Sequence, residues 1–192
     1  RVIPDGGHLV VTQGLLRLES SVRLNGDASD TFLVKSGAKL DFWNFSSATN
    51  ASPCTLICAP LASVTAGSGY HPYNTWWGPV TLNGTTFLDG GNTGYSMTFT
   101  NAISGDGSLV KNGVCAAFLF SSNNTYAGTT AVSNGIVYVT YPGGLPGYDA
   151  ANRVIIGPLG TLVTYYGEDG TGWTKEHIDA IRTNANFAYV TA

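Results

Sequence analysis

Residues 104–140 constrain the fold of this chain more than any other stretch, because they read as short strands separated by glycine and asparagine corners. Val137 and Val139 alternate with polar neighbours, which is the period-2 pattern of a half-buried strand. Glycine and asparagine supply the positive φ angles and side-chain bonds that tight corners need. Such closely spaced corners predict either an antiparallel β-sandwich or a chain that winds as a parallel β-helix. The strand-length runs are residues 108–111, 116–121 and 129–140, the last interrupted by Asn134-Gly135.

A longer motif runs through the same stretch. The segment GDGSLVKNG is followed by a strand that ends in LFS, then by NNTYAGTT and by a second strand, GIVYV. In this order of segments, the stretch resembles the autotransporter-associated β-strand repeat of bacterial surface proteins. One departure is VCA at residues 114–116, where the family usually has a Gly-Thr-Leu step. The matching segments lie at residues 105–113, 119–121, 123–130 and 135–139.

Two flanking segments are similar to sequences that accompany this repeat in the same family. WGPVTLNGTTF, at residues 77–87, resembles the coil that precedes the repeat. Residues 145–181, followed by Phe187, resemble a module that often comes after it, in which a strand leads to a G-x-W-T-x-x-x-I-D-x-L run. Together the matches cover residues 77–187, whereas residues 1–76 rest on their strand pattern alone.

The resemblance implies an all-β fold, a right-handed parallel β-helix (solenoid) with one short C-terminal helix. We expect a single domain over residues 1–192, with roughly six to eight coils that each rise about 4.8 Å. Its expected parts are weakly patterned coils over residues 1–76, repeat-like coils over 77–140, and a loop, strands and the helix over 141–192.

Alternation of apolar and polar residues predicts the other elements. The helix is expected to begin after Thr174, a good N-cap residue, with Ile178 and Ile181 on one apolar face and an end near Arg182. Gly157-Pro158 is expected to form a corner between two strands. The predicted strands outside the repeat are residues 8–12, 15–18, 31–35, 39–45, 56–59, 62–66, 95–103, 153–156 and 161–165.

Composition favours a secreted, corner-rich protein. Only 11% of the residues are charged, and 25 are glycine. The net charge of −3 argues against a nucleic-acid partner, which needs clustered cations. No run of 18 apolar residues occurs, so we expect no direct membrane insertion by this segment. The chain starts mid-pattern without a signal segment, which indicates a piece of a longer protein. The resemblance to bacterial surface proteins implies that it works outside the cell or on a bacterial surface.

Three cysteines leave the redox state open. Cys54 and Cys58 could form a disulfide in an oxidising compartment or stay unpaired, and we expect Cys115 to be a small buried apolar residue. The C-x-x-x-C spacing without a second pair is weak evidence for zinc, so no metal or cofactor is predicted.

The segment over residues 67–77 concentrates aromatic side chains and reads as a loop. One interpretation is a surface that stacks on sugar rings or meets a protein partner, since aromatic faces offer a large apolar area. The commoner arrangement is that Trp76 and Trp77 fold back and cover a flank of the solenoid. The possible contact residues are Tyr70, His71, Tyr73, Trp76 and Trp77, and His71 alone has no catalytic role.

The sequence contains no recognisable catalytic constellation. A β-helix enzyme that cleaves acidic polysaccharides needs several carboxylates on one exposed sheet, but here the acids are scattered and Glu168-Asp169 is the only adjacent pair. The first expectation is therefore a non-catalytic structural segment that forms a rod or assembles with copies of itself. The alternative is a carbohydrate-binding or adhesion module that uses the aromatic loop to hold surface glycans, and a polysaccharide-cleaving enzyme comes last.

Overall fold

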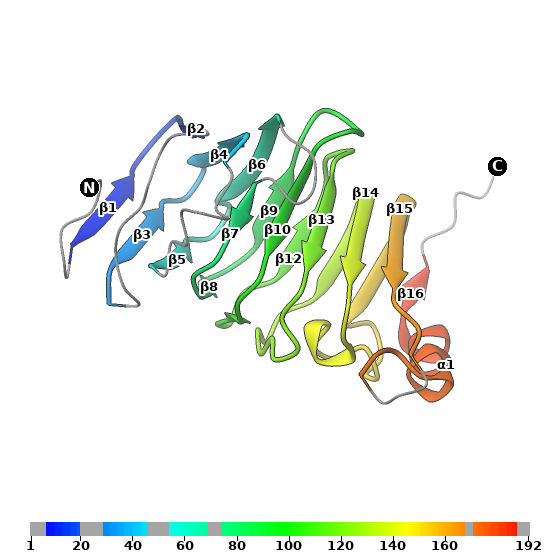
Figure 1. Ribbon diagram of the computed structural model, residues 1–192. Helices are drawn as coiled ribbons and strands as arrows, with labels where there is room; N and C mark the ends of the chain where they lie inside the picture. The colour runs from blue at the N-terminus through cyan, green and yellow to red at the C-terminus, as the bar shows by residue number, and fades with distance from the viewer. Residues whose placement is uncertain (1–6, 20–28, 46–53, 69–73, 168–170, 188–192) are drawn as a thin grey trace.

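The chain winds as a parallel β-solenoid of about six turns, as the family resemblance implies, and the described residues contain one short α-helix. The computed structural model describes residues 7–19, 29–45, 54–68, 74–167 and 171–187. Figure 1 shows the strands stacked side by side along the solenoid, with α1 (Lys175–Asn184) at the C-terminal end. Within these residues no helix is long and apolar enough to cross a membrane.

Successive coils place their strands in rows. One row is a five-stranded sheet, and the others join in an eleven-stranded sheet; every named pairing is parallel. The first sheet consists of β1 (His8–Val11), β3 (Thr31–Val34), β5 (Thr55–Cys58), β8 (Val80–Leu82) and β11 (Ile103–Ser104).

The larger sheet contains two rows that meet in long strands. Its first row is β2 (Leu15–Glu19), β4 (Lys39–Trp43), β6 (Ser63–Ser68), β9 (Thr86–Asp89) and β12 (Leu109–Lys111), and its second is β7 (Thr75–Trp76), β10 (Ser96–Phe99) and β13 (Ala116–Leu119). The strand β14 (Thr130–Val139) pairs with both β12 and β13, and β15 (Val154–Thr164) pairs with β14. The C-terminal β16 (Asn186–Phe187) adds two residues beside β15, and the 3-10 helix η1 (Pro142–Gly144) lies between β14 and β15.

A period of 24 residues sets the register of the early coils. Leu15 pairs with Lys39, and Lys39 pairs with Ser63, so each coil repeats the side-chain pattern of the one before. Alternate residues in each strand point inward, as Leu40 and Phe42 do in β4, and stack on their equivalents in the next coil. The result is one continuous apolar core along the solenoid.

The predicted strands and helix are confirmed in the main, but three details are wrong. Residues 95–103, expected as one strand, are divided between β10 and β11, which lie in different sheets. Gly157-Pro158 does not form a corner, because β15 runs through it without a break. Asn134-Gly135 also lies inside one strand, β14, where the register against β15 shifts between Val132 and Asn134. A β-bulge in β15 accommodates Gly157-Pro158, because these two residues lie opposite Ser133 alone and the proline has no ladder bond to donate there. Gly135 is paired with Gly160 and takes a φ of 76° within β14.

The helix α1 begins where the cap pattern predicts and ends two residues beyond Arg182, at Asn184. The backbone N–H of Thr174 donates to Nδ1 of His177 across 3.1 Å, which satisfies one backbone donor at the helix start. Ile181 is buried against the core, and Ile178 is 37% exposed.

Glycine and asparagine in the repeat motif hold neighbouring coils at close range. A Cβ at Gly107 would overlap the carbonyl oxygen of Gly84 in the preceding coil, and one at Gly128 would overlap the carbonyl of Gly107. Asn124 is buried, and its side chain accepts from the N–H of Ile103 and donates to the carbonyl of Gly144, both at 2.8 Å. One asparagine side chain thus links the corners of three successive coils.

We predict that Gly107→Ala destabilises the fold, because the added methyl group would overlap the backbone of Gly84 and no rotamer change can remove this overlap. The expected cost is about 1–3 kcal/mol, which thermal unfolding followed by circular dichroism measures as a lower Tm. Gly91→Ala is the matched control, since nothing lies within 4 Å of a Cβ at that position. Equal Tm values for the two variants would contradict the proposed close packing of corners.

Candidate functional site

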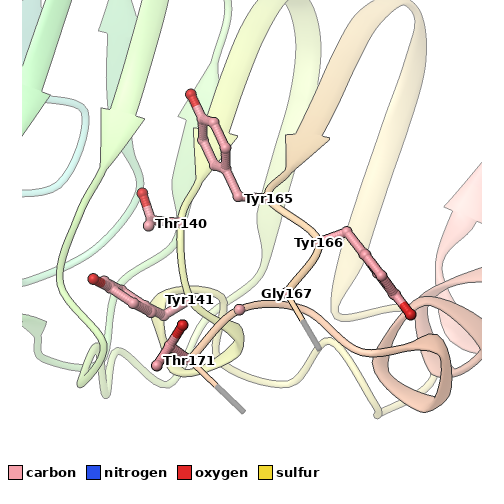
Figure 2. Close-up of a pocket in the computed structure, with 7 residues that line it drawn as sticks. Thr140, Tyr141, Tyr165, Tyr166, Gly167 and Thr171 are labelled. Carbon is pink, nitrogen blue, oxygen red and sulfur yellow. The ribbon is translucent and has the colours of Figure 1, made fainter. Parts of the chain in front are cut away.

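A pocket lined by tyrosines lies at the C-terminal end of the solenoid, where β14 and β15 end (Figure 2). Its volume is about 470 Å³. Thr140 and Tyr141 follow β14, whereas Tyr165 and Tyr166 follow β15. The residues that line it are Thr140, Tyr141, Tyr165, Tyr166, Gly167, Thr171 and Gly172.

Buried Trp173 fixes the two walls of this pocket relative to each other. Its indole N–H donates to the carbonyl of Val139 across 3.0 Å, next to Thr140. Its backbone N–H donates to the carbonyl of Tyr165, and its own carbonyl accepts from Gly167. The wall from β14 and the wall from β15 are therefore held by one residue.

A column of aromatic rings leads along the outer face of the sheet to the pocket. Phe118 and Tyr138 occupy paired positions in β13 and β14, and their rings stack with centroids 4.4 Å apart and planes 5° apart. The ring of Tyr165 continues the column at 6.4 Å from Tyr138. The neighbours of Tyr138, Val137 and Val139, are buried, so the alternation of β14 places Tyr138 on the opposite, outer face.

The pocket offers aromatic faces and uncharged polar groups. Tyr141 and Tyr165 are 36% and 46% exposed, and Figure 2 shows Tyr166 pointing away from both. The hydroxyl oxygen of Thr140 is buried and has no hydrogen-bond partner among the residues that the structure describes. None of the described lining residues carries a charged side chain. The arrangement is suited to stacking and hydrogen bonding with a neutral ligand.

The aromatic loop predicted as a contact surface is only partly described. Tyr70, His71 and Tyr73 lie outside the described residues. Trp76 is fully buried in β7, where it meets Phe32 edge-on at 5.7 Å and stacks on Phe42 at 6.2 Å. Trp76 is therefore a core residue without access to a ligand, whereas Trp77 is 41% exposed.

All three cysteines are free and buried, so the structure contains no disulfide between Cys54 and Cys58. Burial raises the pKa of the Cys58 thiol to about 12. Cys115 is fully buried, as predicted, and its thiol donates to the carbonyl of Asp89. Among the described residues no group of three or more His, Cys, Asp or Glu side chains could hold a metal ion.

The lysine and the tyrosine of the repeat motif both face the interior. Lys111 is 1% exposed, and its ammonium group donates to the carbonyls of Gly113 and Asn134. Burial lowers the pKa of Lys111, and the neighbouring Cys115 partly offsets that shift. The side chain of Tyr126 is also buried, and its hydroxyl shares a hydrogen bond of 2.5 Å with Thr130.

Two of the scattered acids share an outward row that sequence reasoning missed. The register pairs Asp41 with Thr65 and Thr65 with Asp89, at intervals of 24 residues that a search for this period would have found. Asp41 forms an ion pair of 2.7 Å with Arg17, accepts from the Thr65 hydroxyl and is 2% exposed. Its carboxylate is enclosed by these partners and does not reach a bound polymer.

No protein-family model, curated protein or solved structure matches this chain.

We predict that Tyr126→Phe changes the alkaline part of the stability profile. Burial raises the pKa of Tyr126 from 10.0 to about 12, so the unfolded chain loses this proton before the folded chain does. Stability from this residue is present below pH 10 and falls away between pH 10 and 12. In the unchanged protein this titration lowers the free energy of unfolding by about 2–3 kcal/mol, and Tyr126→Phe does not show that decrease. At pH 7 the variant is about 1 kcal/mol less stable, because it lacks the hydrogen bond of the hydroxyl.

Urea unfolding at several pH values between 7 and 11.5 measures this difference. Tyr166→Phe is the matched control, because that side chain is 62% exposed and its removal leaves the profile parallel to that of the unchanged protein. A constant gap between Tyr126→Phe and the unchanged protein over this range would contradict burial of the hydroxyl.

Proposed function

We propose that this chain is a non-catalytic structural segment of a secreted or surface-displayed bacterial passenger protein, in which the solenoid serves as a rod that assembles with copies of itself. The observation that carries the proposal is the use of the repeat motif. Its glycines, lysine, asparagine and tyrosine contact neighbouring coils or face the core, so the motif encodes stacking.

Three contacts illustrate this use of the motif. The side chain of Asn124 bonds to the coils on either side of it, and the glycine at 107 leaves space for the backbone of the preceding coil. The buried ammonium group of Lys111 donates to the carbonyl of Gly113 and to the carbonyl of Asn134 in the neighbouring strand β14. Because the most specific positions of the motif make contacts between coils, the sequence is suited to an extended solenoid.

The outermost described coils favour contact with further copies. At one end, a hollow of about 370 Å³ lies between β15 and α1, with apolar side chains of Ile156, Leu162 and Phe187 in its wall. Leu159 of β15 is 71% exposed beside it. At the other end Val10 and Leu15 are 43% and 52% exposed. A copy stacked end to end would cover apolar surface and pair strand edges on both sides.

An extracellular location fits the same account. A solenoid with few charged side chains and many hydroxyl and amide groups at its corners resembles passenger segments that act outside the cell, where self-association or surface glycans would be the partners. The enclosed carboxylate of Asp41 favours a non-catalytic role over a polysaccharide-cleaving one.

We predict that the purified chain forms end-to-end assemblies at high concentration, because stacking buries the exposed apolar side chains of the outer coils. Negative-stain electron microscopy should show filaments whose axial repeat is close to the length of one solenoid. Leu159→Lys should prevent them, since a charge at an edge strand opposes pairing with another strand.

Ala127→Lys provides the control, because it adds the same charge at an exposed position between β13 and β14, away from the edge strand. It should assemble like the unchanged protein. Single short rods at every concentration, or filaments of Leu159→Lys as abundant as those of the control, would contradict end-to-end assembly.

A further inference from the structure

Coil stacking does not account for the tyrosine-lined pocket. Tyr141 and Tyr165 keep 36% and 46% of their surface in solvent, although both are large side chains close to the apolar core. Trp173 connects the walls that carry them through hydrogen bonds to Val139 and Tyr165. The two rings are therefore held on backbone that is fixed from inside, which is the usual condition of a preformed binding site.

The aromatic column runs along the solenoid and ends at the pocket. The faces of Phe118 and Tyr138 meet in nearly parallel planes, so the column runs from one coil to the next along the solenoid. Tyr165 is its last ring and is tilted by 32° from Tyr138 at the mouth of the pocket. A ligand with a flat apolar face would lie against Tyr165 and extend this column.

The polar groups of the pocket favour a ligand rich in hydroxyl groups. Among the described residues the Thr140 hydroxyl has no hydrogen-bond partner, and Thr171 adds a second hydroxyl side chain to the lining. Gly167 and Gly172 also line the pocket and contribute backbone only. Each described lining group is uncharged, so an anionic ligand would find no cation there.

We propose that this pocket binds a neutral oligosaccharide, with one pyranose ring packed against Tyr165 and Tyr141 and its hydroxyl groups directed to Thr140 and Thr171. A pyranose ring has an apolar C–H face and a polar rim, which matches the aromatic faces and hydroxyls of the pocket. Nucleic-acid bases also stack on aromatic rings, but their phosphates require cations that the lining does not provide. A volume of about 470 Å³ lies within the range of small-molecule sites.

Saturation-transfer difference NMR with a panel of tetrasaccharides tests this assignment. The panel contains cellotetraose, maltotetraose, mannotetraose and β-1,4-galactotetraose, with an acidic tetragalacturonate for comparison, and dilute protein is used so that binding is measured apart from assembly. We expect at least one neutral member to bind and tetragalacturonate not to bind. For the neutral ligand, Tyr165→Ala and Tyr141→Ala should each weaken binding about tenfold, and Tyr165→Phe should retain it because the ring face remains.

Trp77→Ala is the matched control, because this side chain is also an exposed aromatic residue but lies outside the pocket lining. It should bind as the unchanged protein does. Circular dichroism melting of every variant verifies that the fold is retained. No binding by any neutral tetrasaccharide at millimolar concentration, unchanged affinity of the double variant Tyr141→Ala/Tyr165→Ala, or loss of binding in Trp77→Ala alone would overturn the proposal. The binding experiment does not test rod assembly, which depends on the outer coils and is tested separately by electron microscopy.

Discussion

Parallel stacking of successive coils at a fixed spacing is the constraint on which the rest of the structure depends. Each strand obtains its backbone partners from the coils on either side, so every corner must bring the chain back into register. The 24-residue period of the early coils achieves this, and the glycines at 84, 107 and 128 allow corners of successive coils to approach without a side chain between them. The apolar core follows from the same register, because equivalent inward residues stack on one another.

Polar groups inside the solenoid obey the same constraint. Asn124, Lys111 and Tyr126 are buried, and each one makes hydrogen bonds that hold corners or adjacent coils together. Register also creates surface features, because residues at equivalent positions share one face. Phe118 and Tyr138 become a stacked pair in this way, and their column ends at a pocket that Trp173 holds in place. The proposed binding surface therefore depends on the register of the coils.

Sequence pattern was sufficient to place most of the strands, because they are short, alternating and separated by glycine and asparagine. The pattern alone did not distinguish a sandwich from a parallel β-helix, because both contain short strands with closely spaced corners. It was insufficient at Gly157-Pro158, since a local turn signal does not distinguish a corner from a β-bulge within a continuous strand. Tryptophan on an apparent loop was equally ambiguous, and Trp76 lies in the core between Phe32 and Phe42. The tyrosine pocket could not be predicted, because it unites residues about 25 positions apart whose proximity depends on bonds made by Trp173.

Removal of one whole coil tests the central claim most directly. A variant that lacks residues 39–62 joins Ala38 to Ser63, so that β2 meets β6 in the register that β4 had occupied. Thermal unfolding followed by far-ultraviolet circular dichroism should show a β-sheet spectrum and a cooperative transition at a somewhat lower Tm, because nearest-neighbour stacking is preserved. Deletion of residues 51–62, about half a coil, should abolish both the β-sheet spectrum and the cooperative transition, because the following strands lose their register. Loss of the sheet signal in the whole-coil variant, with retention in the half-coil variant, would contradict the account.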